Sequence, residues 1–491
     1  MVVVGIDLGT QSVKAVVCDE QLAVVGSHAV AQTVAHPRPG WAEQDPRDWE
    51  RALAPAIRGA LAAAGVPASE VRAIALAGQL DGCVAVDASG APLHPALIWQ
   101  DRRAADETER CEPGRLFELT GQIADASHLA AKARWLRAHG IVAARFHQPV
   151  SYIVARLTGA AVLDPAHAST TMLFDLHAGA WSRELCDAFE LDPALLPAVQ
   201  PATAIAGTLT ADGARLTGLP AGVPVAVGTG DDFATPLGAG IVAPGPIACT
   251  LGTAEVVGAL AGEPVFDLPA RRAATDPWRA LAEPMVETHA YPAGGYFVEN
   301  PGWLSGGAVR WALGMFGFAS DAELDAAAAS APPGADGVTF VPALTGMMTP
   351  VWRSQARGTL HGLTAAHDRS HVARAILEGL AFACRDVVQR LVALGLTARD
   401  VVVLGGGGKS RVWLQIRADA LGLRHHVAAR TDTCPVGAAM LAAVAAGWLP
   451  DLAAAAALAP AHSAATTPQR SLDEAYERYR DLVMRLVTTA T

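Results

Sequence analysis

The stretch VVVGIDLGTQSVKAVV, residues 2–17, decides the fold. Its two β-branched runs flank a turn rich in glycine, threonine and serine, which predicts a strand, a tight turn and a second strand. A similar stretch, GPIACTLGTAEVVG, occupies residues 245–258, about half a chain away. One such hairpin at the start of each half predicts two similar domains with their turns facing a shared cleft. Coincidence between two short hairpins is the alternative.

A domain boundary is expected near Gly240, after an apolar run at 223–227 and its glycine-rich continuation. The two domains would then be residues 1–240 and 241–491, because a chain of 491 residues exceeds what one hydrophobic core usually serves. Strand-like runs alternate with helix-like runs in both halves, and this alternation predicts an α/β fold.

Composition narrows the class of protein. The chain has 37 basic and 48 acidic residues, a net charge of −11, which argues against nucleic acid or an anionic membrane as a partner. The apolar stretch 438–460 is broken by glycine, proline and aspartate, so no membrane span is expected. Seven scattered cysteines and an N-terminus without a leader indicate a cytoplasmic protein with reduced thiols.

Two short motifs follow predicted strands. The backbone N–H groups of a turn such as Asp7-Leu8-Gly9-Thr10 can hold phosphate oxygens, and a carboxylate at the strand end can hold Mg²⁺ through water. In the run from Gly228 to Asp232, glycines let a substrate approach a carboxylate that can accept the proton of an attacking hydroxyl. An ordinary hairpin and an aspartate-rich turn are the respective alternatives. Asp232 is the weaker candidate of the adjacent acids.

The run from Gly405 to Ser410 must be tested as a phosphate-binding P-loop. That motif requires glycine at position 403, where this chain has Val403, so the match fails at a required position. The remaining glycine-rich turn suits the approach of an adenine or ribose ring. A P-loop ATPase centred on Lys409 is a rival hypothesis.

A cluster of Trp99, Asp101, Arg102 and Arg103 follows an apolar run at 96–98. It is either a salt-bridged turn or a set of hydroxyl-binding side chains in a sugar pocket.

Together these pieces resemble the FGGY carbohydrate kinases, and within that family the xylulokinases most closely. Residues 5–14, 39–46 and 99–103 are similar to family motifs, and the run from Gly358 through Glu378 fits the family's C-terminal signature. The N-terminal signature is matched at Lys132, Trp135 and Leu136, whereas Leu129 departs from it.

The resemblance implies an α/β fold of two ribonuclease-H-like domains, as in actin-like ATPases, around a central cleft that binds ATP, Mg²⁺ and a sugar. It assigns Asp231 as the general base and Asp7 as the catalytic carboxylate that positions Mg²⁺ through water. The implied ATP-binding residues are Gly9, Thr10, Gln11, Lys14, Gly252, Thr253, Gly405, Gly406, Gly407, Gly408 and Ser410. The implied substrate-binding residues are Gln79, Leu80, Asp81, Trp99, Asp101, Arg102, Asp231 and Asp232.

Three departures concern the substrate. Asp81 stands where xylulokinases have a histidine, Met347-Met348 replaces an ion pair, and Asp232 replaces an asparagine. A carboxylate accepts two hydroxyl hydrogen bonds where a neutral imidazole accepts one. D-Xylulose is therefore the leading substrate, with another pentulose, a tetritol or a pentitol as alternatives. A non-catalytic sugar- or nucleotide-binding relative is the alternative of another class. A homodimer is compatible with the sequence, which carries no interface signature.

Overall fold

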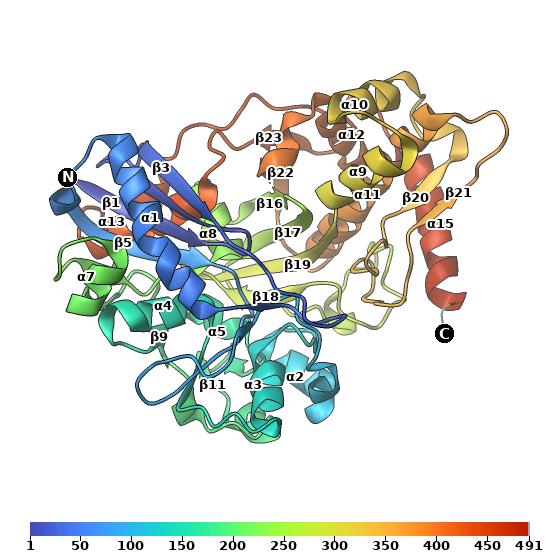
Figure 1. Ribbon diagram of the computed structural model, residues 1–491. Coiled ribbons are helices and arrows are strands. Elements are labelled where there is room, and N and C mark those ends of the chain that lie inside the picture. The colour runs from blue at the N-terminus through green and yellow to red at the C-terminus, as the bar shows by residue number, and fades with distance from the viewer. Residues whose placement is uncertain (490–491) are drawn as a thin grey trace.

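The computed structural model describes residues 1–489 and contains two large mixed sheets with helices on both faces of each (Figure 1). The first sheet is centred on β1 (Val2–Leu8), which pairs antiparallel with β2 (Ser12–Cys18) and parallel with β5 (Val71–Gly78). The other strands of this sheet are β3 (Val24–Ala31), β13 (Ile205–Thr208), β14 (Pro224–Ala226) and β15 (Thr229–Gly230).

The second sheet repeats this plan. Its central strand β16 (Gly245–Leu251) pairs antiparallel with β17 (Ala254–Ala261) and parallel with β22 (Ala398–Leu404). The flanking strands are β18 (Glu287–Ala290), β19 (Tyr296–Leu304) and β23 (Arg424–Val427). The predicted repeat of two similar α/β units, each opening with a hairpin, is confirmed.

Hydrophobic residues on both faces of each sheet create a layered core. In β1, Val3 faces one side, and Val2, Val4 and Ile6 face the other. The second side is covered by α1 (Pro46–Ala64) and α4 (Pro149–Thr158). In the second sheet, the outer face is covered by α11 (Arg369–Ala393), α12 (Arg411–Leu421) and α15 (Asp473–Thr489).

Two helices lie between the sheets, α8 (Asp231–Gly238) and α13 (Thr433–Ala445). Although α13 belongs to the second half of the chain, it packs on β1 and β5, and Figure 1 shows it among the blue strands. A Cβ atom on Gly5 of β1 would lie 1.9 Å from the Pro435 carbonyl oxygen. The contact is therefore so close that only glycine fits.

Where α8 and α13 cross, each helix has a glycine at the contact, Gly238 in α8 and Gly437 in α13. A Cβ atom on Gly437 would lie 2.1 Å from the Ala234 carbonyl oxygen, and one on Gly238 would lie 1.9 Å from the Thr433 carbonyl oxygen. Because α8 begins at Asp231, this crossing fixes the position of that carboxylate.

We expect Gly437→Val to separate these helices and lower the free energy of unfolding by about 1–3 kcal/mol, the usual cost of overpacking. A Cβ atom on Gly314, in helix α9 (Gly306–Phe316), would have no neighbour within 4 Å, so Gly314→Ala is the matched control and should leave stability equal or higher. Thermal unfolding measures both, and equal melting temperatures for the two variants would contradict the packing argument.

A smaller layer in the first half contains α2 (Pro113–Thr120), α3 (Leu129–Ala138) and α6 (Arg183–Ala188) around its own core. It meets the second half through β18, where the Thr288 N–H group donates to the Gly121 carbonyl oxygen at 3.0 Å. The remaining helices are α5 (Pro165–Ser169), α7 (Ala211–Thr217), α10 (Asp321–Ser330) and α14 (Leu452–Ala456). Short strand pairs join β4 (Glu43–Gln44) with β7 (Ala96–Leu97), β6 (Val84–Val86) with β8 (Arg145–His147), β9 (Val162–Leu163) with β12 (Ala198–Val199), β10 (Phe174–Asp175) with β11 (Ala180–Trp181), and β20 (Thr339–Val341) with β21 (Thr359–His361).

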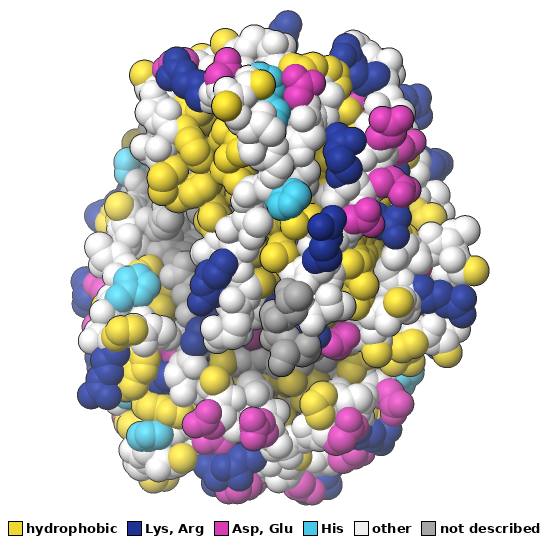
Figure 2. Space-filling view, turned by 90° about the vertical axis from the view of Figure 1, so that its right-hand side faces the viewer, with side chains coloured by type: hydrophobic (Ala, Val, Ile, Leu, Met, Phe, Trp, Pro, Cys, Tyr) yellow, Lys and Arg dark blue, Asp and Glu magenta, His cyan; other side chains and the backbone are white. Residues whose placement is uncertain are grey.

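Within residues 1–489, no helix is both long and apolar enough to cross a membrane. The face of the molecule drawn in Figure 2 carries basic and acidic side chains interspersed. This face therefore presents no concentrated positive charge for a polyanion.

Candidate active site

The turn between β1 and β2 is held from three sides. The Gly9 N–H group closes it on the Ser12 carbonyl oxygen at 3.0 Å. The Gln44 side-chain amide donates to the Thr10 carbonyl oxygen at 2.9 Å, and the Trp99 indole N–H donates to the Thr10 hydroxyl at 3.0 Å. Trp99 thus lies against the predicted phosphate turn, and Gln11 at its tip is exposed.

The turn between β16 and β17 contacts the first turns of α9. The Gly306 N–H group donates to the Gly252 carbonyl oxygen at 3.1 Å, and the Arg310 guanidinium donates to the Thr253 hydroxyl at 2.7 Å. A helix N-terminus and an arginine both favour bound anions. Sequence reasoning missed Arg310, although the Gly306-Gly307 pair one helical turn before it is a visible signal.

The carboxylates of Asp7 and Asp231 influence each other. Burial, and then the charge of Asp231, raises the pKa of Asp7 to about 7. Burial raises the pKa of Asp231 to about 6, and the charge of His167 opposes that rise. The Asp7 Oδ1 atom is buried and has no hydrogen-bond partner among the described residues. Two buried acids at one place, one of them with an unpaired oxygen, form a site that a cation would stabilise.

Lys14, predicted to bind ATP, forms an ion pair with Asp432 at the start of α13. This contact joins the two halves of the chain beside Asp7. The Lys14 ammonium lowers the pKa of Asp7, although less than burial raises it.

A second layer supports Asp231. The Asp164 carboxylate accepts hydrogen bonds from the Thr229 hydroxyl at 2.7 Å and from the His167 backbone N–H at 3.1 Å, and its Oδ1 atom lies 3.0 Å from His167 Nδ1. Thr229 precedes Asp231 by two residues, and all three supporting side chains are buried. The sequence reasoning did not identify Asp164 or His167, because their nearest local pattern is a short helix with no catalytic signature.

Two hydrogen bonds fix the backbone of Asp81. Its φ of 60° is in the left-handed region, which is uncommon for aspartate. Its N–H group donates to Gln148 Oε1 at 2.9 Å, and its carbonyl oxygen accepts from Lys132 Nζ at 2.8 Å. Lys132, the signature lysine, is fully buried and also donates to the carbonyl oxygens of Ile98 and Ser127. Its ammonium therefore joins three segments at the base of the site.

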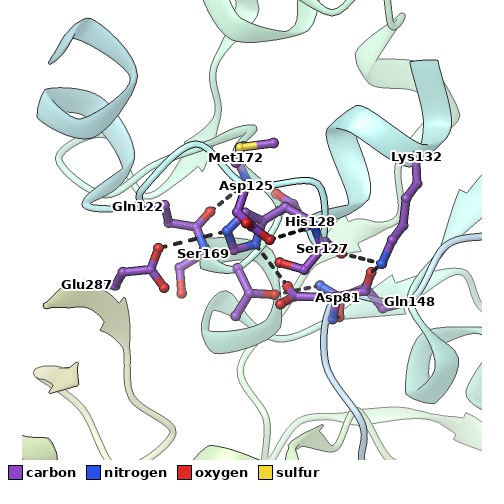
Figure 3. Close-up of polar contacts among 12 residues, drawn as sticks. Asp81, Gln122, Asp125, Ser127, His128, Lys132, Gln148, Ser169, Met172 and Glu287 are labelled. Carbon is purple, nitrogen blue, oxygen red and sulfur yellow. Dashed lines mark hydrogen bonds and ion pairs between the residues drawn. The ribbon is translucent and has the colours of Figure 1, made fainter. Parts of the chain in front are cut away.

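Figure 3 shows the His128 ring between the carboxylates of Asp81 and Glu287. His128 Nδ1 lies 3.2 Å from Asp81 Oδ1, and Nε2 lies 3.8 Å from Glu287 Oε1. Burial disfavours the imidazolium, but the carboxylates of Asp81, Glu287 and Asp125 together outweigh it, and the pKa of His128 rises to about 9. Glu287 comes from the second half of the chain, so these residues join the two halves.

Two more residues of the second sheet, His289 and Glu299, lie beside Glu287. His289 Nε2 lies 3.5 Å from Glu299 Oε1, and the rings of His289 and Phe233 have centroids 5.5 Å apart. Phe233 directly follows Asp232 in α8. Burial, and then the charge of Asp232, raises the pKa of Glu299 well above its usual range. Sequence reasoning missed Glu287, His289 and Glu299, because nothing local links them to residues of the first half of the chain.

One predicted substrate ligand must be withdrawn. Asp101 is fully buried, and its carboxylate binds the Ala42 N–H group and the Arg103 guanidinium. No oxygen is left for a substrate, so the salt-bridged turn is the correct interpretation for Asp101. Arg102 is half exposed and pairs with Asp125. It remains a candidate.

Two other predicted ligands are also occupied by protein contacts. The Gln79 side chain donates to Gln44 Oε1 at 2.9 Å and is almost fully buried. A Cβ atom on Gly230 would lie 2.0 Å from Leu80 Cδ2, so Leu80 packs against β15, the strand that ends just before Asp231. Both residues support neighbouring parts of the site.

The four glycines after β22 differ in their surroundings. Gly405 has a φ of 82°, which suits glycine. Cβ atoms on Gly407 and Gly408 would approach Leu251 and Val427 within 3 Å, whereas Gly406 faces open space. The Ser410 hydroxyl accepts the Trp413 N–H group at 3.0 Å and caps α12. Gly406 is therefore the glycine with room for a nucleotide.

Lys409 is exposed beside this turn. We expect Lys409→Ala to change the Kd for ATP by less than about threefold, since an exposed charge contributes about 0–1 kcal/mol. Titration with a fluorescent ATP analogue measures the Kd. Loss of nucleotide binding would instead support the P-loop hypothesis.

Comparison with known proteins identifies the class. Family models of the FGGY family of carbohydrate kinases match residues 2–238 with the N-terminal domain and residues 247–446 with the C-terminal domain. The chain belongs to this family. It is an ATP-dependent carbohydrate kinase, a phosphotransferase built on the two-domain α/β fold that the sequence predicts.

Individual relatives carry different substrate names. A glycerol kinase from Alkalilimnicola ehrlichii is 33% identical over 465 residues, covering 91% of this chain and 90% of the relative. A xylulose kinase from Klebsiella pneumoniae is 33% identical over 454 residues, covering 90% and 89%. A solved structure described as a "xyloylose kinase" from Brucella ovis superposes with a TM-score of 0.90 at 30% identity and covers all of both chains.

Proposed function

We propose that the protein transfers the γ-phosphoryl group of ATP to a terminal hydroxyl of a small ketose, with D-xylulose as the first candidate and Asp231 as the base. The position of Asp231 carries the proposal. It is a partly buried carboxylate at the start of α8, beside Asp7, on a backbone fixed by the crossing of α8 and α13. A kinase needs such a group to accept the hydroxyl proton as attack proceeds.

The residues around Asp231 have matching roles. The turns at Thr10 and Thr253 would bind phosphate oxygens, with Arg310 stabilising negative charge on the transferring group. Gly406 would leave room for the adenosine. Closure of the two halves would exclude water, which otherwise competes with the sugar for the phosphoryl group.

Mg²⁺ fits the residues present, because the buried Asp7 Oδ1 atom has no partner among residues 1–489 and its neighbour Asp231 is also acidic. Asp7 would hold the ion through water. When bound, Mg²⁺ would neutralise phosphate charge during transfer.

A polyol is the second candidate acceptor, and two observations favour it. Asp81 replaces the histidine expected for a xylulokinase, and glycerol kinases match this chain at the same identity as xylulose kinases. ADP production by the purified protein should be measured with ATP, Mg²⁺ and D-xylulose, D-ribulose, glycerol, erythritol or xylitol. Phosphorylation of none of these would contradict the proposal.

The pH dependence of the reaction follows from the raised pKa of Asp231. The base must be deprotonated, so protonation below about pH 6 should remove activity. We expect kcat/KM to fall about tenfold per pH unit below that value. A pH–rate profile that stays flat down to pH 4.5, with the fold intact by circular dichroism, would contradict this role for Asp231.

A further inference from the structure

The strongest unassigned feature is an acid–imidazole wall, which we define as Asp81, His128, Glu287 and Glu299. Two of its members come from each half of the chain. The wall lies next to Asp232, because Phe233, the following residue, contacts the His289 ring that pairs with Glu299. What the wall binds therefore bears on the acceptor of the proposed kinase reaction.

Two polar atoms of the wall lack a hydrogen bond to each other and could share one hydroxyl group. His128 Nε2 is buried, has no hydrogen-bond partner in the described chain, and lies 3.8 Å from Glu287 Oε1. That separation is too long for a hydrogen bond. Figure 3 shows the two groups facing each other. A hydroxyl beside the pair could accept from the imidazole N–H and donate to the carboxylate, whose Oε1 atom also accepts the Ile123 N–H group at 2.7 Å.

Other unpaired atoms around the wall include both donors and acceptors. Gln122 accepts the Met172 N–H group at 2.7 Å through Oε1, which fixes its amide and leaves Nε2 buried without a partner in residues 1–489. Glu299 Oε2 is likewise buried and unpaired. Only a group that both donates and accepts satisfies such a mixed set, and hydroxyl groups do so.

The number of unpaired polar groups sets how many hydroxyl groups the acceptor needs. Glycerol has three hydroxyls, and one would be needed at Asp231. The two remaining could not serve the His128–Glu287 pair, Gln122 and Glu299 together. Each buried polar group left unpaired costs about 1–3 kcal/mol. A chain with four or more hydroxyls would leave fewer of them unpaired.

The charges of the wall also determine which net charge the acceptor can carry. It offers one cation, His128, whose imidazole already faces the carboxylates of Asp81 and Glu287. The carboxylate of a sugar acid would lie beside Glu287, Glu299 and Asp232, and no residue of the wall offers it a free positive partner. Burying a charge without such a partner is costly.

We infer that the acid–imidazole wall selects neutral acceptors with at least four hydroxyl or carbonyl oxygens, in preference to glycerol and to sugar acids, and that Glu287 and His128 determine this selection. The inference rests on the proposed kinase function and names its substrate class.

The test compares kcat and KM for glycerol, erythritol, D-xylulose and D-gluconate in the wild type and in Glu287→Gln and His128→Gln. We expect kcat/KM for erythritol or D-xylulose to exceed that for glycerol and gluconate by roughly tenfold or more. In both variants KM for the preferred acceptor should rise about tenfold or more, with glycerol changed by less than about threefold. The exposed Glu283, four residues before Glu287, gives the matched control Glu283→Gln, for which all constants should stay unchanged.

The outcomes separate the inference from the function on which it rests. Glycerol or gluconate as the best acceptor, or variants that weaken every acceptor equally, would overturn the inference while the kinase function stands. Turnover of no acceptor would overturn both. Binding of an ATP analogue and the melting temperature, measured for each variant, show whether a loss of selectivity arises from misfolding.

Discussion

Replacing Asp231 by alanine should reduce the kcat of phosphoryl transfer by a factor of about 10²–10⁴, the scale of general-base catalysis. Without the carboxylate, the attacking hydroxyl has no group to accept its proton. ATP binding should change little, because the turns at Thr10 and Thr253 that would hold the phosphates do not depend on this side chain. Steady-state kinetics and titration with an ATP analogue measure the two effects separately.

The neighbouring acid gives a matched control. Asp232→Asn preserves the shape of a side chain that is not assigned as the base, so it should change KM for the acceptor more than kcat. If Asp231→Ala retained more than about one per cent of the wild-type kcat, the assignment of the base would be wrong. If Asp232→Asn lowered kcat as much as Asp231→Ala with KM unchanged, Asp232 would be the better candidate.

Much of the fold could be predicted because its signals are local. The hairpins at residues 2–17 and 245–258 carry their turn residues within them, and both form as the sequence predicts. The start of α11 is marked by a less usual signal. Asp368 caps α11, and His371 Nδ1 accepts the Asp368 N–H group in a reciprocal arrangement. That pattern is visible in the sequence once histidine is accepted in the place that glutamate usually takes.

The packing of α13 could not be predicted in the same way. Its sequence predicts a buried helix, but no local pattern indicates that it lies on the sheet of the other half. Only the shape of Gly5, Gly238 and Gly437 in three dimensions explains the contact. The same limit applies to the candidate site, where Asp7 and Asp231 follow strands and could be found, whereas His128 and Glu287 come from different halves of the chain and meet through tertiary contacts alone.

The largest effect on stability is expected at Arg417, in the core of the second half. Arg417 and Glu255 form a fully buried ion pair. Its guanidinium also lies 3.0 Å from Cys249 Sγ and 3.1 Å from Cys384 Sγ. Cys249, Glu255 and Cys384 have the composition of a metal site, but the guanidinium already supplies the positive charge between them. This group therefore has a structural role.

The pair also supports the second phosphate turn. Glu255 follows Thr253 by two residues, and its Oε2 atom accepts the Ser305 hydroxyl at 2.7 Å just before α9 begins. Loss of Arg417 should thus loosen both the core and the turn. We expect KM for ATP to rise in any variant that still folds.

Arg417→Met should lower the free energy of unfolding by about 3–5 kcal/mol, because it leaves the Glu255 carboxylate buried and uncompensated. The double variant Arg417→Met with Glu255→Met should recover most of that loss, since well-packed apolar side chains can replace a buried ion pair at little cost. Arg424→Met is the control, because Arg424 is exposed and its pair with Asp400 should contribute at most about 1 kcal/mol. Thermal unfolding compares the three variants. Equal melting temperatures for Arg417→Met and Arg424→Met would show that the buried pair does not hold this domain together.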